Sequence, residues 1–339
     1  MRAGIIGPGR VSTEHIKAYG ECGIDVVAVC GRTIESARRK IQEMDLQARS
    51  YDNLDEMLWR EELDCLSICS PQEHHATHII QAARQRIRPL HLVIEKPIVH
   101  TASTLTEVCR AVSDARIITM VCFVLRWNEL VQNIKNSMKK IGTIKFFEIC
   151  YWNGPSHEKP PVNIAGKMTL DTIISGGCHA VDMARFLLDT DIVSVSAITP
   201  AEENEFQRTT SALVKCRNGA SGMISATSEA FMPYLFNIVL LGDRGAIFLN
   251  KIYSESSEYS KSQKHKRPFL ESFETIPGII PERGEVLHHP FPAMMREFAD
   301  CVRNGKDTSC NLADALNTHK TCFAAIESAR RGGKTIVIR

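Results

Sequence analysis

A short glycine turn near the start of the chain has the spacing of a phosphate-binding loop. The segment Gly-Pro-Gly-Arg-Val-Ser at residues 7–12 follows the apolar run Ala3–Ile6 and opens an amphipathic stretch. Glycines let a backbone approach a pyrophosphate, and the free N–H groups at the start of a helix attract negative charge. Ser12 replaces the third glycine of the pattern but is small enough for close helix packing. The turn predicts dinucleotide binding, with a glycine turn that binds no ligand as the alternative.

The residues after the second apolar run, Asp25–Cys30, bear on which nicotinamide cofactor is bound. A dinucleotide fold that binds NAD has an acidic residue there for the 2'-hydroxyl of the adenosine ribose. This chain has Gly31, Arg32 and Thr33 instead. Arg32 and Thr33 suit a 2'-phosphate, because a guanidinium forms charge-assisted hydrogen bonds with it. We expect NAD or NADP as the cofactor, with a lean towards NADP. A solvated Arg32 without a ligand is the alternative.

Two further polar segments follow the third and fourth apolar runs. One begins with Ser70 and Pro71 and extends to His75, and the other contains Glu95 and Lys96. Ligands of open α/β sheets bind at the carboxyl ends of the strands, so both segments are candidates for the cofactor site. A lysine in a cleft donates to a substrate hydroxyl or alkoxide, and desolvation can bring its pKa into the range of acid-base catalysis.

A glycine pair in the second half of the chain precedes a histidine and an aspartate. Gly176 and Gly177 permit a close approach of backbone to ligand, and His179 and Asp182 are three residues apart, on one face of a helix that begins there. An imidazole accepts a hydroxyl proton as a hydride leaves the same carbon. The alternative is that His179 caps or packs the helix while Asp182 makes a structural salt bridge.

The first third of the chain alternates short apolar runs with amphipathic stretches, which is typical of a parallel sheet covered by helices on both faces. We predict an α/β fold whose first domain, residues 1–122, is a doubly wound Rossmann sheet. The expected strands are Ala3–Ile6, Asp25–Cys30, Cys65–Cys69, His91–Ile94 and Ile117–Cys122, and the expected helices are Ser12–Tyr19, Ile34–Met44, Leu54–Trp59, Ala76–Arg84 and Ser103–Val112.

The pattern changes after Arg126, where strands follow one another without intervening helices. Such a run predicts an antiparallel or mixed sheet in a second α/β domain, residues 123–339. A helix at Asn128–Lys140 comes first, and Ser254–Pro268 is expected to be an exposed loop or edge. The expected strands are Thr143–Trp152, Ile192–Ile198, Ser211–Cys216, Ser221–Thr227, Phe236–Leu241, Ala246–Leu249 and Thr335–Ile338, with helices near Pro290–Arg303 and Leu312–Arg331.

Composition excludes several classes of function. The 339 residues are 44% hydrophobic and carry 41 basic against 39 acidic side chains, a formal net charge of +2. This length predicts two domains, and the balanced charge leaves no basic surface for nucleic acid or an anionic membrane. No apolar stretch is long enough to span a membrane. Twelve scattered cysteines and an N-terminus without a signal segment predict free thiols and a cytoplasmic protein, and no cysteine pair has the spacing of a metal site.

The motifs taken together, in this order and spacing, resemble the Gfo/Idh/MocA family of oxidoreductases, which includes glucose-fructose oxidoreductase and inositol dehydrogenase. The resemblance rests on the glycine turn, on Glu95-Lys96-Pro97, on Arg126-Trp127-Asn128 and on the motif at residues 176–182. It implies a Rossmann domain followed by an α/β domain whose large open sheet forms a homodimer or homotetramer. It also implies NAD(P)-dependent oxidation or reduction of a carbon that bears a hydroxyl, on a polyhydroxylated sugar, cyclitol or sugar derivative.

The resemblance also implies roles for individual residues. Lys96 matches a lysine that contacts the nicotinamide ribose and the substrate, and His179 matches the histidine that acts as acid-base catalyst. Ser175 stands where many members have an aspartate, and a serine is no carboxylate base at neutral pH. We expect Asp182, Ser175, Arg126 and Asp171 to bind substrate. The expected cofactor-binding residues are Gly7, Pro8, Gly9, Arg10, Val11, Arg32, Thr33, Ser70, Pro71, His75, Glu95 and Lys96.

Two other functions stay open at this point. Some relatives of the family retain the nucleotide and cleave a glycosidic bond through transient oxidation, so retained cofactor with glycoside hydrolysis would indicate an NAD-dependent glycosidase. Alternatively, Ser175 marks lost chemistry, and the chain is a non-catalytic dinucleotide-binding protein.

Overall fold

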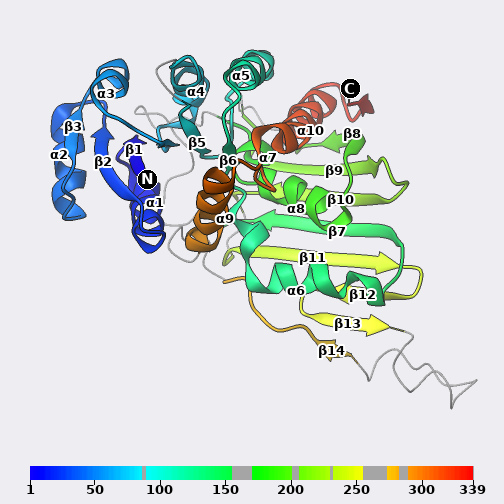
Figure 1. Ribbon diagram of the computed structural model, residues 1–339. Coiled ribbons are helices and arrows are strands. Elements are labelled where there is room, and N and C mark those ends of the chain that lie inside the picture. The colour runs from blue at the N-terminus through cyan, green and yellow to red at the C-terminus, as the bar shows by residue number, and fades with distance from the viewer. Residues whose placement is uncertain are drawn as a thin grey trace, which may run out of the picture. The chain divides into compact units, whose positions relative to one another are not determined.

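The computed structural model describes residues 1–85, 89–154, 170–200, 206–229, 232–254, 273–281 and 289–338. The chain forms two compact units (Figure 1). The first contains Met1–Val124 and His289–His319, and the second contains Leu125–His288 and Lys320–Arg339. The chain first passes from one unit to the other after Val124, close to the boundary expected at residue 122. The return of residues 289–319 to the first unit was not anticipated, because an amphipathic helix pattern does not indicate which core it joins.

The first unit is built on a six-stranded parallel sheet with the order β3-β2-β1-β4-β5-β6. This order, with β1 between β2 and β4, confirms the predicted doubly wound Rossmann sheet. The short strand β3 was not predicted, because it has three residues of which only Tyr51 is buried. The strands are β1 (Arg2–Ile6), β2 (Asp25–Cys30), β3 (Arg49–Tyr51), β4 (Cys65–Ile68), β5 (His91–Ile94) and β6 (Thr119–Val121).

Helices connect these strands, as each parallel crossover requires. Helix α1 buries the face that carries His15, Ile16 and Tyr19. The helices of this unit are α1 (Arg10–Glu21), α2 (Ile34–Glu43), α3 (Leu54–Arg60), α4 (His75–Ala83), α5 (Ala102–Ala115) and α9 (Phe291–Asn304), with a 3-10 turn, η1 (Gln72–His74), before α4.

The second unit is built on a nine-stranded sheet with the order β14-β13-β12-β11-β7-β10-β9-β8-β15 (Figure 1). Strands β10 and β7 are parallel, whereas the other neighbouring pairs are antiparallel, so the predicted mixed sheet is confirmed. The strands are β7 (Ile144–Trp152), β8 (Ile192–Ile198), β9 (Thr209–Cys216), β10 (Ser221–Thr227), β11 (Leu235–Gly242), β12 (Gly245–Phe248), β13 (Lys251–Ser254), β14 (Glu274–Thr275) and β15 (Ile336–Val337).

One face of this sheet is buried and the other is exposed. In β9 the buried Ala212 and Val214 alternate with the exposed Leu213 and Lys215. Helix α8 (Cys178–Leu188) packs on β7 and β10, and the short helix α7 (Thr172–Ser175) packs on β9 and β10. The remaining elements are η2 (Val124–Trp127), α6 (Glu129–Ser137), η3 (Met138–Lys140), α7 (Thr172–Ser175), α8 (Cys178–Leu188) and α10 (Leu312–Arg330).

Two sequence expectations concern other parts of the chain. The segment Ser254–Pro268 lies outside the described residues except for Ser254 itself, which ends β13. Within the described ranges, no helix is long and apolar enough to cross a membrane.

Candidate active site

The glycine turn lies at the carboxyl ends of β1 and β4. Gly7 has φ +89°, and a Cβ added to it would lie 2.3 Å from the backbone nitrogen of Ser70. Only glycine fits there, because a side chain would collide with the neighbouring strand end and the backbone conformation is left-handed. The backbone N–H of Gly7 donates to the Cys30 carbonyl at 2.9 Å, which fixes the turn against β2 as well.

The start of α1 is open where a pyrophosphate would bind. Gly9 precedes the helix, and a Cβ added to it would meet no heavy atom within 4 Å. Arg10 and Val11 form the first turn, and the buried Ser12 donates from its hydroxyl to the Gly9 carbonyl at 2.7 Å. Ser12 thus packs where the pattern has glycine and leaves the turn intact. A tight turn beside an open N-terminus of a 12-residue helix fits a dinucleotide phosphate.

Arg32 and Thr33 follow β2, as expected, but only Arg32 is available for a 2'-phosphate. The Thr33 hydroxyl caps α2 by accepting from the Ser36 N–H, and the Ser36 side chain completes a capping box. Arg32 is exposed at the end of the strand. The sequence Thr-x-x-Ser was itself a signal for this cap.

The segment after β4 is anchored by its histidines. The His75 ring lies between two carbonyls, with Nδ1 2.6 Å from the Pro97 oxygen and Nε2 2.7 Å from the Ser70 oxygen. A neutral imidazole has one proton for these two acceptors. Burial nonetheless lowers the pKa of His75, against the opposing effect of both carbonyls and of Glu95. His75 therefore ties the segment that follows Ser70 to the segment that follows Lys96.

The neighbouring Ser70 hydroxyl lies 2.8 Å from Nδ1 of His78, and Pro71 is exposed beside it. Burial, with His74 and His75 nearby, lowers the pKa of His78 to about 4. His78 is therefore neutral at pH 7.

Glu95 and Lys96 follow β5 at the same edge of the sheet. Glu95 is buried, Lys96 is partly exposed, and the Lys96 backbone N–H donates to Oε2 of Glu95 at 3.2 Å. Burial alone would raise the pKa of Glu95, but the hydrogen bond and charge of His15, with Lys96 and His75, outweigh it and lower that pKa. Glu95 is thus a buried carboxylate next to the lysine that the sequence singled out.

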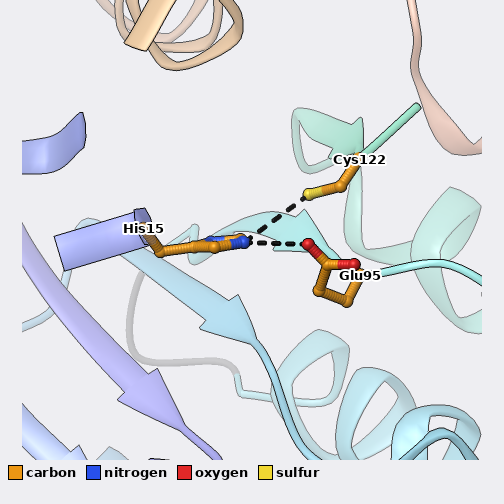
Figure 2. Close-up of side chains that lie close together, drawn as sticks. All are labelled: His15, Glu95 and Cys122. Atoms are coloured by element: carbon orange, nitrogen blue, oxygen red, sulfur yellow. Dashed lines mark hydrogen bonds and ion pairs between the residues drawn. The ribbon is translucent and has the colours of Figure 1, made fainter. Parts of the chain in front are cut away.

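Behind Glu95 lies a buried network of four side chains, which we call the His15 network: Tyr19, Ser67, His15 and Glu95. Distances along it are 2.7 Å from Tyr19 to Ser67, 3.0 Å from Ser67 to Nδ1 of His15, and 3.0 Å from Nε2 of His15 to Glu95. Figure 2 shows His15 pointing at Glu95, with the Cys122 sulfur 3.9 Å from the same ring nitrogen. His15, Glu95 and Cys122 offer three donor atoms within 4.8 Å of one another, but hydrogen bonding alone accounts for the contacts.

Chemistry fixes the donor at the Glu95 end of the network. Ionised Glu95 only accepts, so Nε2 of His15 carries the proton between them. The Ser67 hydroxyl lies within hydrogen-bond distance of both Nδ1 of His15 and the Tyr19 hydroxyl. Burial raises the pKa of Tyr19 well above its usual value, which keeps the phenol a donor. The four side chains are therefore joined by continuous hydrogen bonds, and the network holds Glu95 in place.

His179 lies in the second unit, in the first turn of α8. It is 5% exposed, and its ring stacks on that of Tyr151 with the centroids 6.3 Å apart and an interplanar angle of 19°. A Cβ added to Gly176 would lie 2.5 to 2.8 Å from the Tyr151 ring and hydroxyl, so glycine is required for Tyr151 to lie against the junction of α7 and α8. The glycine pair thus brings an aromatic ring, from the end of β7, to the candidate base.

Asp182 pairs with Arg126 inside the second unit. The guanidinium donates from Nε at 2.7 Å and from Nη2 at 2.6 Å to the two carboxylate oxygens, and both residues are at most 4% exposed. The Arg126 guanidinium also lies over the Phe186 ring, 5.3 Å from its centroid. Bidentate pairing fixes both side chains. The structural salt bridge that was the alternative for Asp182 is therefore present. Its partner is Arg126, which we expected to bind substrate.

Asp171 and Ser175 flank the short helix α7. Asp171 is 4% exposed and accepts from the Gln207 backbone N–H at 2.7 Å, and burial raises its pKa despite that bond. The Ser175 hydroxyl lies 3.4 Å from the Thr172 carbonyl. Cys178 donates weakly to the Ser175 carbonyl at 3.6 Å. Asp171 thus immediately precedes α7, while Ser175 ends that helix one turn before His179.

Each unit therefore gathers its own share of the expected residues. The first unit collects the glycine turn, Ser70, His75, Glu95 and Lys96 along one sheet edge. The second collects Ser175, His179, Asp182 and Arg126 around the start of α8. The His15 network and Tyr234, whose ring lies 5.4 Å from that of Tyr151, were not predicted from the sequence. A polar histidine on the apolar face of α1 was the one signal for the network.

Comparisons with known proteins agree with this arrangement. The model of the Gfo/Idh/MocA oxidoreductase family, with its NAD-binding Rossmann fold, matches residues 1–123, and that of the GFO/IDH/MocA C-terminal domain matches residues 133–248. The scyllo-inositol 2-dehydrogenase (NAD(+)) of Bacillus subtilis is 24% identical over 342 residues, which cover 98% of this chain and 95% of that protein. The inositol 2-dehydrogenase of Rhizobium meliloti is 26% identical over 330 residues, covering 93% and 95%.

Solved structures share the fold of the whole chain. An oxidoreductase from Agrobacterium radiobacter in complex with NAD+, L-tartaric acid and magnesium has a TM-score of 0.82 at 19% identity, covering 100% of this chain and 98% of that one. A levoglucosan dehydrogenase in complex with NADH and L-sorbose has a TM-score of 0.85 at 18% identity, covering 100% and 99%.

Proposed function

Because this chain belongs to the Gfo/Idh/MocA oxidoreductase family, we propose that it transfers a hydride between NAD(P) and a hydroxyl-bearing carbon of a sugar, cyclitol or sugar derivative. The glycine turn carries the proposal: Gly7 admits no Cβ beside Ser70, while Gly9 leaves the start of α1 open. This combination suits a pyrophosphate. The relatives named as inositol dehydrogenases support a polyhydroxylated substrate.

The first unit would hold the cofactor. We assign the pyrophosphate to the backbone of Gly7, Pro8, Gly9, Arg10 and Val11, and the remainder of the nucleotide to Arg32, Thr33, Ser70, Pro71, His75, Glu95 and Lys96. When bound, the nicotinamide supplies the hydride acceptor or donor. Arg32 supports a preference for NADP, since residues 31–33 after β2 include a guanidinium and no carboxylate.

Two side chains are assigned to the reacting hydroxyl. His179 takes up its proton as the hydride leaves and returns it in the reverse reaction. Lys96 donates to the same oxygen and stabilises negative charge on it. Ser175 and Asp171 are assigned to further substrate hydroxyls. Arg126 and Asp182 are assigned to the same site through their ion pair, which fixes the helix that carries His179.

The exposed face of the nine-stranded sheet supports assembly into a homodimer or homotetramer. Leu213 and Met223 are opposite each other in the register of β9 and β10 and are 59% and 39% exposed. Ile198, Phe248 and Val337 on other strands of this sheet are also exposed. Large apolar side chains exposed on one sheet support its use as an interaction surface.

The test is to incubate the purified protein with NAD+ or NADP+ and a panel of inositols and sugars, and to follow the reduced nucleotide. We expect one reduced nucleotide per oxidised substrate for at least one compound, with NADP+ bound more tightly. Nucleotide binding without reduction across the panel would contradict the proposal and indicate a non-catalytic protein. Glycoside hydrolysis with retained nucleotide and no net reduction would indicate a glycosidase.

A further inference from the structure

The hydroxyl of Tyr234 is buried in the second unit without a hydrogen-bond partner in the described part of the chain. Tyr234 is 6% exposed and immediately precedes β11. Buried hydroxyls in native proteins almost always have a partner, so an unsatisfied one calls for an explanation such as a bound molecule.

The surroundings of Tyr234 connect it to the candidate base. Its ring packs edge-on against Tyr151, with the centroids 5.4 Å apart and an interplanar angle of 72°. Tyr151 stacks in turn on His179. The Tyr151 ring lies against Gly176, where no side chain fits. Tyr234, Tyr151 and His179 thus form one continuous group of rings, which we call the aromatic wall.

The chemistry of the Tyr234 hydroxyl is that of a neutral donor. Burial, with Tyr151 and Cys150 nearby, raises the pKa of Tyr234 well above its usual value, so the phenol keeps its proton at any physiological pH. A neutral phenol can donate a hydrogen bond to an uncharged oxygen, and this contact buries no charge. The flat rings beside it offer an apolar surface to the C–H face of a cyclic polyol.

We propose that Tyr234 is a substrate-binding residue whose hydroxyl donates a hydrogen bond to a ring hydroxyl oxygen of the polyol, in the site that contains His179. The inference rests on the proposed function, which it extends by naming a residue that selects a hydroxylated ring. A ring that carries hydrogen in place of that hydroxyl would leave Tyr234 unsatisfied in the complex and would bind more weakly.

The test compares the wild type with Tyr234→Phe and with Tyr253→Phe, a matched control on β13 whose side chain is partly exposed. Each protein is loaded with NAD+ or NADP+ and titrated with myo-inositol, scyllo-inositol and glucose by saturation-transfer NMR. We expect Tyr234→Phe to weaken the tightest-binding probe about tenfold, and the Kd for nucleotide to stay unchanged. With a turned-over probe, KM rises and kcat is retained. Tyr253→Phe changes none of these values.

A second measurement separates binding from a structural role. If the hydroxyl awaits a ligand, the free Tyr234→Phe variant has an unchanged Tm or one raised by about 2 °C, because an unsatisfied donor has been removed. A lowered Tm would show that the hydroxyl has a partner within the protein and would overturn the inference. Equal probe affinity in the variant and the wild type would also overturn it, as would a wild type that binds none of the three probes. A probe that binds but reduces neither nucleotide contradicts the proposed function alone, since the affinity comparison uses no turnover.

Discussion

Two sets of buried polar side chains, one in each compact unit, differ in whether their hydrogen bonds are satisfied. In the first unit, hydrogen bonds link all four side chains of the His15 network, Tyr19, Ser67, His15 and Glu95. In the second unit, the Tyr234 hydroxyl is buried with no partner among the residues described. A satisfied network stabilises the protein that contains it, whereas an unsatisfied buried donor costs about 1–3 kcal/mol until something satisfies it. The difference separates residues that hold a site in place from residues that bind what enters it.

The largest expected effect comes from the two residues assigned to the reacting hydroxyl. His179→Asn should lower kcat by about 10²–10⁴-fold through loss of the proton acceptor. Lys96→Met should lower kcat by about 10²–10³-fold through loss of charge stabilisation. Steady-state kinetics measures both, and Tm checks the fold. Lys145→Met, a change at an exposed lysine on β7, is the control and should keep full activity. Wild-type turnover in either site variant would contradict its assignment.

Breaking the buried ion pair should have the next largest effect, on stability. Asp182→Asn leaves the Arg126 guanidinium buried and uncompensated, so the free energy of unfolding in urea should fall by about 3–5 kcal/mol. The double variant Arg126→Met/Asp182→Leu removes both charges and should recover most of that loss. A double variant as unstable as the single one would show that the pair is not the source of the effect.

A direct contrast between the two kinds of burial comes from Ser67→Ala and Tyr234→Phe. Ser67→Ala removes the link between Tyr19 and His15 and should lower the free energy of unfolding by about 1–3 kcal/mol. Tyr234→Phe should leave the free energy of unfolding unchanged. Ser221→Ala, at an exposed position of β10, controls for the loss of a serine hydroxyl. Equal losses at Ser67 and Tyr234 would remove the distinction between the units.

How far the sequence predicts this molecule depends on whether the signal is local. The glycine turn and the Glu95-Lys96 segment were identified correctly as strand-end features, because six neighbouring residues or fewer carry each pattern. The His15 network was missed because Ser67 and Glu95 are 52 and 80 positions from His15, and only the parallel sheet brings them together.

The second unit shows the same limit. The strands β8 and β10 were predicted with their observed bounds, since alternating buried and exposed side chains are readable in one strand at a time. The partner of Asp182 was not predicted, because Arg126 lies 56 positions away. Tyr234 looked like any core aromatic. Only the folded chain shows that its ring is packed while its hydroxyl is unsatisfied.

The smallest expected effect is a pH dependence of stability that originates in the first unit. The pKa of His78 is about 4 in the folded chain and that of His75 is also lowered, against about 6.5 in the unfolded chain. Between these values the unfolded state binds more protons, so stability is complete above about pH 6.5 and falls as the pH drops towards 4. Thermal melts across this range should show the decline, and His78→Gln should make it shallower. If His78→Gln left the slope unchanged, the pH dependence of stability would originate in other groups.

Hydride transfer from a polyol carbon can be followed by isotope transfer. An inositol deuterated at its ring carbons is incubated with the protein and the preferred nicotinamide cofactor, and the reduced nucleotide is isolated and analysed by mass spectrometry and NMR. We expect one deuterium per reduced nucleotide, at nicotinamide C4, and a rate of deuterium transfer lowered by about 10²–10⁴-fold in His179→Asn. Reduced nucleotide without deuterium, or oxidised inositol without reduced nucleotide, would contradict it.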